Sequence, residues 1–497
     1  MTAILNINSI EDVEEIINSY CQMNKEKKVM QGEVFTPYNL IIEMLNALPR
    51  DVWEDPTKKW LDPGAGFGGF SIAAFHFLDV GLKKWQPSKS KRHKHILKNM
   101  LYMVELDSHN VANIRKIFGE NVNVCKCDFI RESDVWKTQF KIDTFHVIYG
   151  NPPYNENGMK GKGRSDVGLK VLWTKFVDQT LDLLEENGYC LFFTPNSWIE
   201  LKSPLSRKMM KHQIVLLKCF DVVKSYKLFN KEAGSMPLCY YIIQKKEPTH
   251  ATKIYDQTLD IYVDFDIHKH MVVPNKNIKF IQKLVSKQDT GSLKDYYKFT
   301  PPKVKKDMAK YSEIKKGKFV YPLVNYVHKK IVTTYANEPS IVQDKQPKII
   351  FPNYSMGYPI IDTRGEYDVG GRTSYYIHLD NYKDKDKDKD KDKDKDKEKN
   401  KKIAKLKKIQ QLFLTNFAFT LINSLKTGQK FMSTRTFDLL PDVTNWREPI
   451  NDETLEAYYD LDNEEKNCIL DQITNGEGNI TDKQREMILN WNNPVNN

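Results

Sequence analysis

Between about residues 30 and 250 of this chain, short apolar segments typical of strands alternate with segments of helical periodicity. This alternation restricts the fold more than any other feature, because strands that alternate with helices form a largely parallel sheet covered by helices. The strand candidates are seven in number: KWLDP, LYMVELD, VNVCKCDF, FHVIYG, GYCLFFTP, IVLLKCFDVV and PLCYYIIQKK. We therefore predict a doubly wound α/β domain with a seven-stranded sheet.

The pattern changes after about Phe265, where short aromatic segments with basic neighbours replace the alternation. We expect a second domain here, either mixed α/β or β-rich. A KD repeat at 383–402 lies within it and cannot bury apolar surface, so a solvated insertion or a helical spacer is expected. The expected parts are a helical segment at 1–30, the α/β domain at 31–265, the second domain at 266–440 and an acidic tail at 441–497.

Positive charge is concentrated in the body of the chain. The net charge at pH 7 is +11, but thirteen acidic and only four basic residues follow Leu440, so the preceding residues carry about +20. A basic body with an acidic end favours an anionic partner such as nucleic acid. A lysine-rich protein whose charge only solvates it would have the same composition.

The chain has no run of 18 or more apolar residues and no signal-peptide pattern at Met1. We therefore expect an intracellular protein without a membrane anchor, and we expect its seven scattered cysteines to be reduced thiols. The histidines show no metal-ligand spacing, so no metal site is expected. The basic stretch KKWQPSKSKRHKHILKN is expected to form a surface loop in which His93 and His95 are solvated.

The segment VIYGNPPY at 147–154 ends an apolar strand on a rigid corner. Pro152 and Pro153 cannot continue a sheet ladder, since neither has a backbone N–H and both restrict φ. The chain therefore leaves the sheet at the carboxyl end of the strand, where ligands of open α/β sheets bind. Asn151 offers an amide and Tyr154 a flat ring, which together can hold a planar, hydrogen-bonding group such as a nucleobase.

The segment LDPGAGFGGF places Asp62 at a strand end and then a glycine-rich turn that includes Gly64 and Gly66. Glycines there let the backbone approach a ligand closely before the next helix begins. The turn suits nucleotides, dinucleotides and S-adenosylmethionine. Its spacing is not the GxGxxG of dinucleotide sites, and no lysine follows as in a phosphate-binding GxxxxGK[ST] loop.

Two further acids follow the next two strands. Glu105 stands where an acid can accept both hydroxyls of a ribose, and Asp128 stands where a carboxylate can accept an adenine amino hydrogen. Each acid alone is more often a helix cap or a surface residue. Three acids at the ends of three consecutive strands outline a nucleoside site.

In order and spacing, these motifs resemble the N6-adenine DNA methyltransferases of type II restriction–modification systems. The resemblance covers about residues 30–250 and rests on GEVFTP, LDPGAGFGGF, VELD, CDF, GNPPY and GYCLFFTPNSW. It implies a Rossmann-like methyltransferase domain, S-adenosylmethionine as cofactor, and methyl transfer to the N6 amine of a flipped adenine in double-stranded DNA. The motif order is similar to that of the class with a C-terminal target-recognition domain, and it leaves open whether a cognate restriction endonuclease exists.

The resemblance also implies which residues would hold the cofactor. Thr36 is expected to cap a helix that begins near Pro37. Thr36 and Pro37 would line the methionine end of the cofactor. Asp62, Gly64 and Gly66 would form the floor of its site. Glu105 would hold the ribose, and Asp128 the adenine.

The catalytic residues implied by the resemblance lie mainly in the NPPY corner. Asn151 and the Pro152 carbonyl would accept hydrogens from the target amine, with Pro153 completing the rigid corner, and Tyr154 would stack on the flipped base. Phe229 is the candidate for a second stacking residue. Candidate DNA contacts in the second domain are Tyr354, Tyr358, Arg364 and Arg372.

Three other functions compete with this interpretation. One is an NPPY methyltransferase that acts on RNA adenine or on a protein glutamine, but the GEVFTP segment and the long basic, aromatic region favour DNA. Another is a non-catalytic DNA-binding subunit, against which the intact NPPY argues. The last is a fused restriction enzyme, which is disfavoured because the segment before residue 30 is short and no clear ExK motif occurs near the C-terminus.

Overall fold

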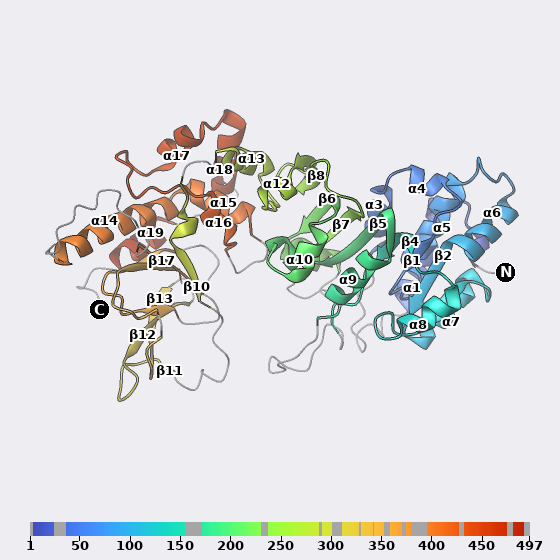
Figure 1. Cartoon of the computed structure of the whole chain (residues 1–497), viewed down its shortest axis with the longest axis horizontal. Coiled ribbons are helices and arrows are strands. Elements are labelled where there is room, and N and C mark those ends of the chain that lie inside the picture. The colour runs from blue at the N-terminus through green and yellow to red at the C-terminus, as the bar shows by residue number, and fades with distance from the viewer. Residues whose placement is uncertain are drawn as a thin grey trace. The chain divides into compact units, whose positions relative to one another are not determined.

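The structure of the chain is a computed structural model (Figure 1). It describes residues 3–23, 36–155, 171–229, 237–287, 291–300, 311–327, 330–340, 342–351, 358–369, 374–379, 395–426, 432–474 and 481–491. The chain divides into two compact units, one formed by Met1–Tyr255 and Asp260–Val273, the other by Asp256–Leu259 and Pro274–Asn497. No helix in the described ranges has the length and apolar character that a membrane span needs.

A mixed sheet of nine described strands forms the centre of the first unit, in the order β3-β2-β1-β4-β5-β7-β6-β8-β9. Strands β3, β2, β1, β4 and β5 are parallel, whereas β7 runs antiparallel between β5 and β6. Their bounds are β1 Trp60–Asp62, β2 Leu101–Glu105, β3 Asn123–Lys126, β4 Phe145–Gly150, β5 Leu184–Pro195, β6 Gln213–Phe220, β7 Leu238–Gln244, β8 Thr252–Asp256 and β9 Ile261–Phe265. The predicted α/β fold is confirmed, and β8 and β9 extend the sheet beyond the seven expected strands.

Helices connect these strands and pack against the sheet, as Figure 1 shows. The helices in contact with strands include α5 (Gly69–Gly81), α7 (Ser108–Phe118), α8 (Ser133–Phe140), α9 (Trp173–Leu183) and α11 (Val222–Leu228). Helix α5 also contacts other helices, namely α1 (Ile10–Met23), α3 (Tyr38–Asn46), α4 (Asp51–Glu54) and α6 (Lys89–His95). Because α5 is enclosed in this way, most of its side chains are apolar and buried.

An aromatic cluster joins β1 to β4 in the core. Trp60 of β1 is fully buried; its ring stacks on Trp53 of α4 at 4.3 Å and meets Tyr149 of β4 edge-on at 5.8 Å. The Tyr149 hydroxyl lies 3.0 Å from the Ser71 hydroxyl of α5. These contacts hold the ends of β1 and β4 together, so the loops that follow both strands start from neighbouring points.

The basic stretch before β2 forms helix α6 (Lys89–His95) and a π-helical turn, η2 (Ile96–Met100), and not the expected surface loop. Arg92 and His93 are buried, and both contact one Asp79 carboxylate oxygen, at 2.7 and 2.9 Å. Burial disfavours the Asp79 carboxylate, but the hydrogen bonds from His93 and Arg92 outweigh it and lower its pKa to about 2. The expectation that His93 is solvated is therefore wrong, because Asp79 supplies a buried partner.

The second unit contains two four-stranded sheets, with orders β10-β17-β14-β15 and β11-β13-β12-β16. The strand bounds are β10 Tyr297–Thr300, β11 Tyr311–Ser312, β12 Tyr321–Val327, β13 Lys330–Ala336, β14 Lys348–Phe351, β15 Ile360–Asp362, β16 Asp368–Val369 and β17 Ser374–His378. Its principal helices are α13 Ile278–Ser286, α14 Lys395–Phe413, α15 Asn416–Ser424, α16 Arg435–Leu439, α17 Asp452–Tyr459, α18 Asn463–Thr474 and α19 Asp482–Asn490.

Two expectations about this unit are refined. The segment expected as an acidic tail forms α17, α18 and α19, and apolar side chains such as Leu455 and Tyr459 are buried there. Of the KD repeat, residues 383–394 lie outside the described residues, while Lys395 and the residues that follow it begin α14.

A buried ion pair joins β14 to β15. The Lys348 ammonium lies 3.1 Å from an Asp362 carboxylate oxygen, with the two side chains 0% and 1% exposed. Asp362 also accepts backbone N–H bonds from Arg364, Gly365 and Tyr367. This carboxylate therefore balances a buried charge and organises the turn that follows β15.

We predict that Asp362→Ala destabilises the second unit by about 3 kcal/mol, because the buried Lys348 charge then keeps only the half-buried Asp344 carboxylate, 3.8 Å away, as a partner. Urea unfolding of the full chain measures this loss. Glu464→Ala is the matched control, since it removes an ion pair with Lys279 that is exposed to solvent on both sides, and such pairs contribute little. Equal losses in the two variants would contradict the role given to the buried pair.

Candidate active site

The loops after β1 and β4 meet at the carboxyl ends of these strands. A β-carbon added to Gly64 would lie 3.4 Å from Cδ of Pro153 and 4.0 Å from Cα of Pro152. The glycine-rich turn therefore lies directly against the NPPY corner. Glycine at this position allows the two backbones to approach closely.

Asp62 is buried at the end of β1, with 1% of its surface exposed. Neither carboxylate oxygen makes a hydrogen bond of good geometry in the described part of the chain. Burial raises the pKa of this carboxyl to about 8 and the Glu105 charge adds to the rise, whereas the nearby Gly64 amide and Ser71 hydroxyl oppose it. A buried, poorly satisfied carboxyl is costly to the fold and is typical of a position that serves a ligand.

Glu105, at the end of β2, ties the glycine-rich turn to that strand. One carboxylate oxygen accepts the Gly66 N–H at 2.7 Å, and the other accepts the Asp107 N–H at 2.8 Å. Glu105 therefore lies beside the glycine-rich turn.

Asp128 is half-buried just beyond the end of β3. One of its carboxylate oxygens accepts the backbone N–H groups of Ile130 and Arg131, at 2.9 and 3.0 Å. This is the capping role that an isolated acid at a strand end often has. Its second oxygen lies 3.9 Å from the Arg131 guanidinium.

Thr36 contacts the NPPY corner from a distant part of the sequence. The Asn151 Nδ2 donates to the Thr36 hydroxyl oxygen at 3.1 Å, and Thr36 is only 7% exposed. Thr36 does not cap the following helix, as had been expected, because Pro37 occupies the N-cap position and its carbonyl accepts from Leu40 and Ile41. The Thr36 side chain instead helps to orient the Asn151 amide.

Tyr154 is buried beside this amide, with 6% of its surface exposed. Burial raises the pKa of its hydroxyl well above the ordinary value, while Asn151 opposes the rise. The Tyr154 carbonyl accepts the Leu172 N–H at 2.9 Å, and Asn155 forms a bridge with Val171. Backbone contacts therefore join the residues just before position 156 to the residues just after position 170.

Known proteins are similar to this chain in sequence. Residues 80–229 match the model of the Eco57I restriction-modification methylase family. An uncharacterized adenine-specific methylase of Mycoplasma pneumoniae is 25% identical over 315 residues, which cover 47% of this chain and 72% of that protein. Residues 80–229 belong to the Eco57I restriction–modification methylase family.

Solved structures resemble the chain more weakly. A modification subunit of a putative type I restriction enzyme from Vibrio vulnificus YJ016 has a TM-score of 0.37 and 17% identity over 50% of this chain and 53% of that one. The M protein of the type I restriction enzyme EcoKI has a TM-score of 0.34 and 14% identity over 45% of this chain and 48% of that one. The chain therefore spans about half the length of these two proteins, and the sequence matches carry the family assignment.

Of the remaining predicted residues, one lies in the core of the first unit, two lie in the second unit, and two lie outside the described residues. Phe229 is 3% exposed and packs on Phe193 of β5 at a ring distance of 5.4 Å, so it belongs to the core in this structure. Tyr358 is buried and Arg364 is exposed in the second unit. Tyr354 and Arg372 lie outside the described residues.

Two residues of the first unit gain importance only from the structure. Gly150 has φ of +139°, and a β-carbon there would lie 2.8 Å from an Asp62 carboxylate oxygen. In the sequence, its position directly before NPPY was the one feature that could have indicated its importance. Tyr20 of α1 stacks on Phe67 of the glycine-rich turn at 6.2 Å, which no local pattern indicates.

We predict that Gly150→Ala destabilises the first unit by at least about 2 kcal/mol, because it combines a strained φ with a steric clash. Urea unfolding followed by tryptophan fluorescence measures the change. Gly317→Ala serves as control, since Gly317 also has positive φ but no atom within 4 Å of the added carbon. If both variants lose the same stability, the contact with Asp62 contributes nothing.

The raised pKa of Asp62 predicts a pH-dependent cost in the cofactor-free protein. The folded state keeps this proton up to about pH 8, whereas the unfolded chain releases it near pH 4, so stability falls across this interval and then levels off. Asp62→Asn removes the titration, and its stability advantage over the wild type should grow by up to about 1.4 kcal/mol per pH unit. Unfolding curves at pH 5, 6, 7 and 8 test this, and a constant difference would contradict it.

Proposed function

We propose that the chain transfers a methyl group from S-adenosylmethionine to the N6 amine of adenine in DNA. The family of residues 80–229 and the similarity to an adenine-specific methylase support the reaction class. The observation that carries the proposal is the Asn151 amide, oriented by Thr36 at the carboxyl end of β4 and adjoining the Gly64 turn.

The chemistry of the target explains why an amide is needed here. The lone pair of the exocyclic N6 is delocalised into the adenine ring, so the amine is a poor nucleophile. Two acceptors, the Asn151 side-chain oxygen and the Pro152 carbonyl, can hold its two N–H bonds and favour a tetrahedral nitrogen. Because this geometry develops in the transition state, these acceptors lower the barrier for methyl transfer.

The Asn151 amide nitrogen points to the Thr36 hydroxyl, so the amide oxygen points away from Thr36. We assign this oxygen as the acceptor for the target amine. Pro152 and Pro153 restrict the backbone on either side of the Pro152 carbonyl. Both acceptors are therefore held by the fold before substrate arrives, which is the preorganisation that catalysis requires.

The residues around the glycine-rich turn fit S-adenosylmethionine, which when bound supplies the methyl group on a sulfonium. The buried Asp62 carboxyl offers two oxygens to the positively charged methionine portion, with Gly64 and Gly66 as the floor. Glu105 would hold the ribose from beside the Gly66 amide. Asp128 would direct an oxygen to the adenine while its other oxygen caps the turn.

Access to duplex DNA requires the target base to leave the helix, at a cost of about a few kcal/mol. We assign part of the compensating stacking to Tyr154, whose ring would need to become accessible from its buried position. We assign recognition of the DNA sequence to the second unit, on the basis of its basic and aromatic composition. The segment 266–440 remains the proposed target-recognition domain.

The deciding experiment is a methyl-transfer assay with S-adenosylmethionine labelled on its methyl group, mixed-sequence duplex DNA and the full chain. Nucleoside analysis should find the label in N6-methyldeoxyadenosine. Asn151→Ala should lower kcat by about 100-fold or more, as expected when one acceptor for a developing transition state is lost. Cofactor binding, measured separately by calorimetry, should change little.

Variants of Thr36 separate orientation from mere packing. Thr36→Val keeps the side-chain shape but cannot accept from Asn151, so kcat should fall by about tenfold, the effect of one neutral hydrogen bond. Thr36→Ser keeps the hydroxyl and should retain most of the activity. Label in RNA or protein instead of DNA would overturn the proposed substrate, and a fully active Asn151→Ala would overturn the proposed mechanism.

A further inference from the structure

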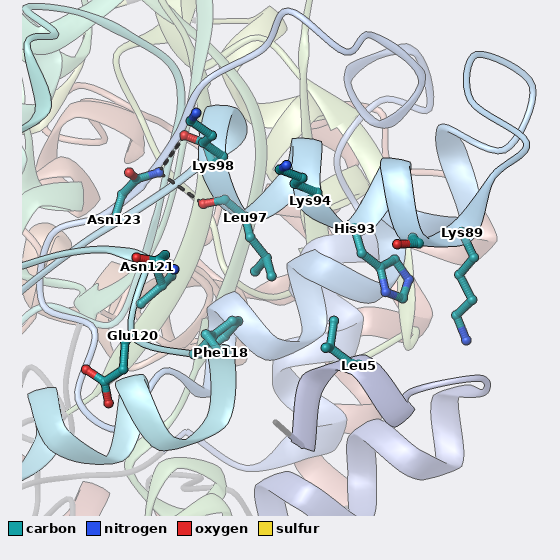
Figure 2. Close-up of a pocket in the computed structure, with 13 residues that line it drawn as sticks. Leu5, Lys89, His93, Lys94, Leu97, Lys98, Phe118, Glu120, Asn121 and Asn123 are labelled. Atoms are coloured by element: carbon teal, nitrogen blue, oxygen red, sulfur yellow. Dashed lines mark hydrogen bonds between the residues drawn. The ribbon is translucent and has the colours of Figure 1, made fainter. Parts of the chain in front are cut away.

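The first unit contains a cavity of about 900 Å³ at the amino ends of strands β2 and β3, whereas the candidate active site lies at the carboxyl ends of the strands. Figure 2 shows it between the N-terminal turn that carries Leu5, the helical segment from Lys89 to Lys98, and the connection from Phe118 to Asn123. Strands β2 and β3 begin beside this cavity and end at Glu105 and next to Asp128. The two sites are therefore separated by the length of these strands, roughly 15 Å.

Polar contacts hold the walls of the cavity in place. The Lys89 ammonium donates to the Ile7 carbonyl at 3.1 Å and also bonds to the Asn8 side chain, which ties α6 to the N-terminal turn. On the opposite wall, the Asn123 side-chain amide donates to the carbonyl oxygens of Leu97 and Lys98 at 3.1 and 3.0 Å, as the dashed lines in Figure 2 show. The cavity is therefore part of the folded unit and not a gap between loosely packed segments.

The charge of the lining is positive. Lys94 and Lys98 are exposed at the cavity, and neither has a carboxylate within ion-pair distance in the described ranges. His93 is not available to a ligand because Asp79 holds its ring nitrogen at 2.9 Å. Glu120 is the one acid among the described lining residues, so the lysines outnumber it.

The remaining lining supplies an apolar surface and an amide. Leu5, Leu97 and Phe118 contribute the apolar surface, and the exposed Asn121 contributes donors and an acceptor. Lysine binds phosphate as a point charge, and apolar side chains with a few polar groups are typical of small-molecule pockets of about 300–1,000 Å³. A concave site of this size suits one nucleotide, whereas the phosphates of a duplex contact broad surfaces.

We propose that this cavity binds a nucleoside polyphosphate, with its phosphates at Lys94 and Lys98 and its base against the apolar wall near Phe118. The site is separate from the S-adenosylmethionine site and does not depend on the proposed methyl transfer. It also gives a role to the basic helical segment before β2, which methyl transfer does not use.

Calorimetric titration of the full chain with ATP and with GTP tests the proposal, in the presence of saturating S-adenosylhomocysteine to block the cofactor site. Binding should persist under this block. The double variant Lys94→Gln/Lys98→Gln should bind the nucleotide about tenfold more weakly, because two charges that face phosphate are lost. Asn121→Asp, which adds a negative charge at an exposed position of the wall, should weaken binding as well.

The matched control is Lys83→Gln/Lys84→Gln, which removes two exposed lysines of the same basic stretch that do not line the cavity. This control should change the affinity less than about twofold, since screened surface charges contribute little at a distance. Thermal unfolding of each variant verifies that the unit is folded.

Several outcomes would overturn the proposal. They are loss of nucleotide binding under saturating S-adenosylhomocysteine, equal weakening by the control and the cavity variants, and no weakening by the cavity variants. The proposal would also be overturned if the wild-type chain bound neither nucleotide, and if Lys94→Gln/Lys98→Gln bound duplex DNA more weakly while the control did not. That result would assign the lysines to the DNA backbone instead.

Discussion

The close approach of β4 to β1 is the contact on which the rest of the candidate active site depends. The strands pair in parallel with Leu61 opposite Ile148, and Gly150 then comes so near Asp62 that no side chain fits between them. The buried edge-on contact between the rings of Trp60 and Tyr149 stabilises this strand pairing. Because the two strands end together, the glycine-rich turn and the NPPY corner lie against each other, and the proposed cofactor and target base would meet there.

The same contact carries a cost for the fold. Asp62 is buried with its oxygens poorly satisfied, and Tyr154 is buried beside Asn151 with a hydroxyl whose ionisation is strongly disfavoured. A core selected only for stability would replace these groups with apolar ones. Polar groups that a fold leaves unsatisfied at the carboxyl ends of parallel strands are better explained by a ligand that completes their hydrogen bonds.

Periodicity predicted most of the first unit correctly because its strands are short, apolar and separated by helices. Predictions failed where a tertiary partner changed the character of a polar segment. The basic stretch around Arg92 and His93 resembles a solvated loop, but Asp79 of a neighbouring helix binds both side chains and buries them. The acidic C-terminal segment resembles a tail, yet Leu455 and Tyr459 provide enough apolar surface for it to pack as helices. Strand β9 was missed because most of its residues are at least partly exposed and show no buried face.

The sequence by itself determined the chemistry of the site: the glycines that allow close approach, the prolines that end β4, and the acids that follow three consecutive strands. These features depend on local backbone preferences and residue type, which can be recognised from the sequence before the fold is known. Only the tertiary structure decided how the parts meet. Thr36 contacts Asn151 across 115 positions, and Gly66 contacts Glu105 across 39. The walls of the cavity that Leu5, Lys94 and Phe118 line likewise come from separate segments. Such contacts follow from the packing of whole elements, because a hydrogen bond between distant residues forms only where the sheet and its helices have already brought the two groups within reach.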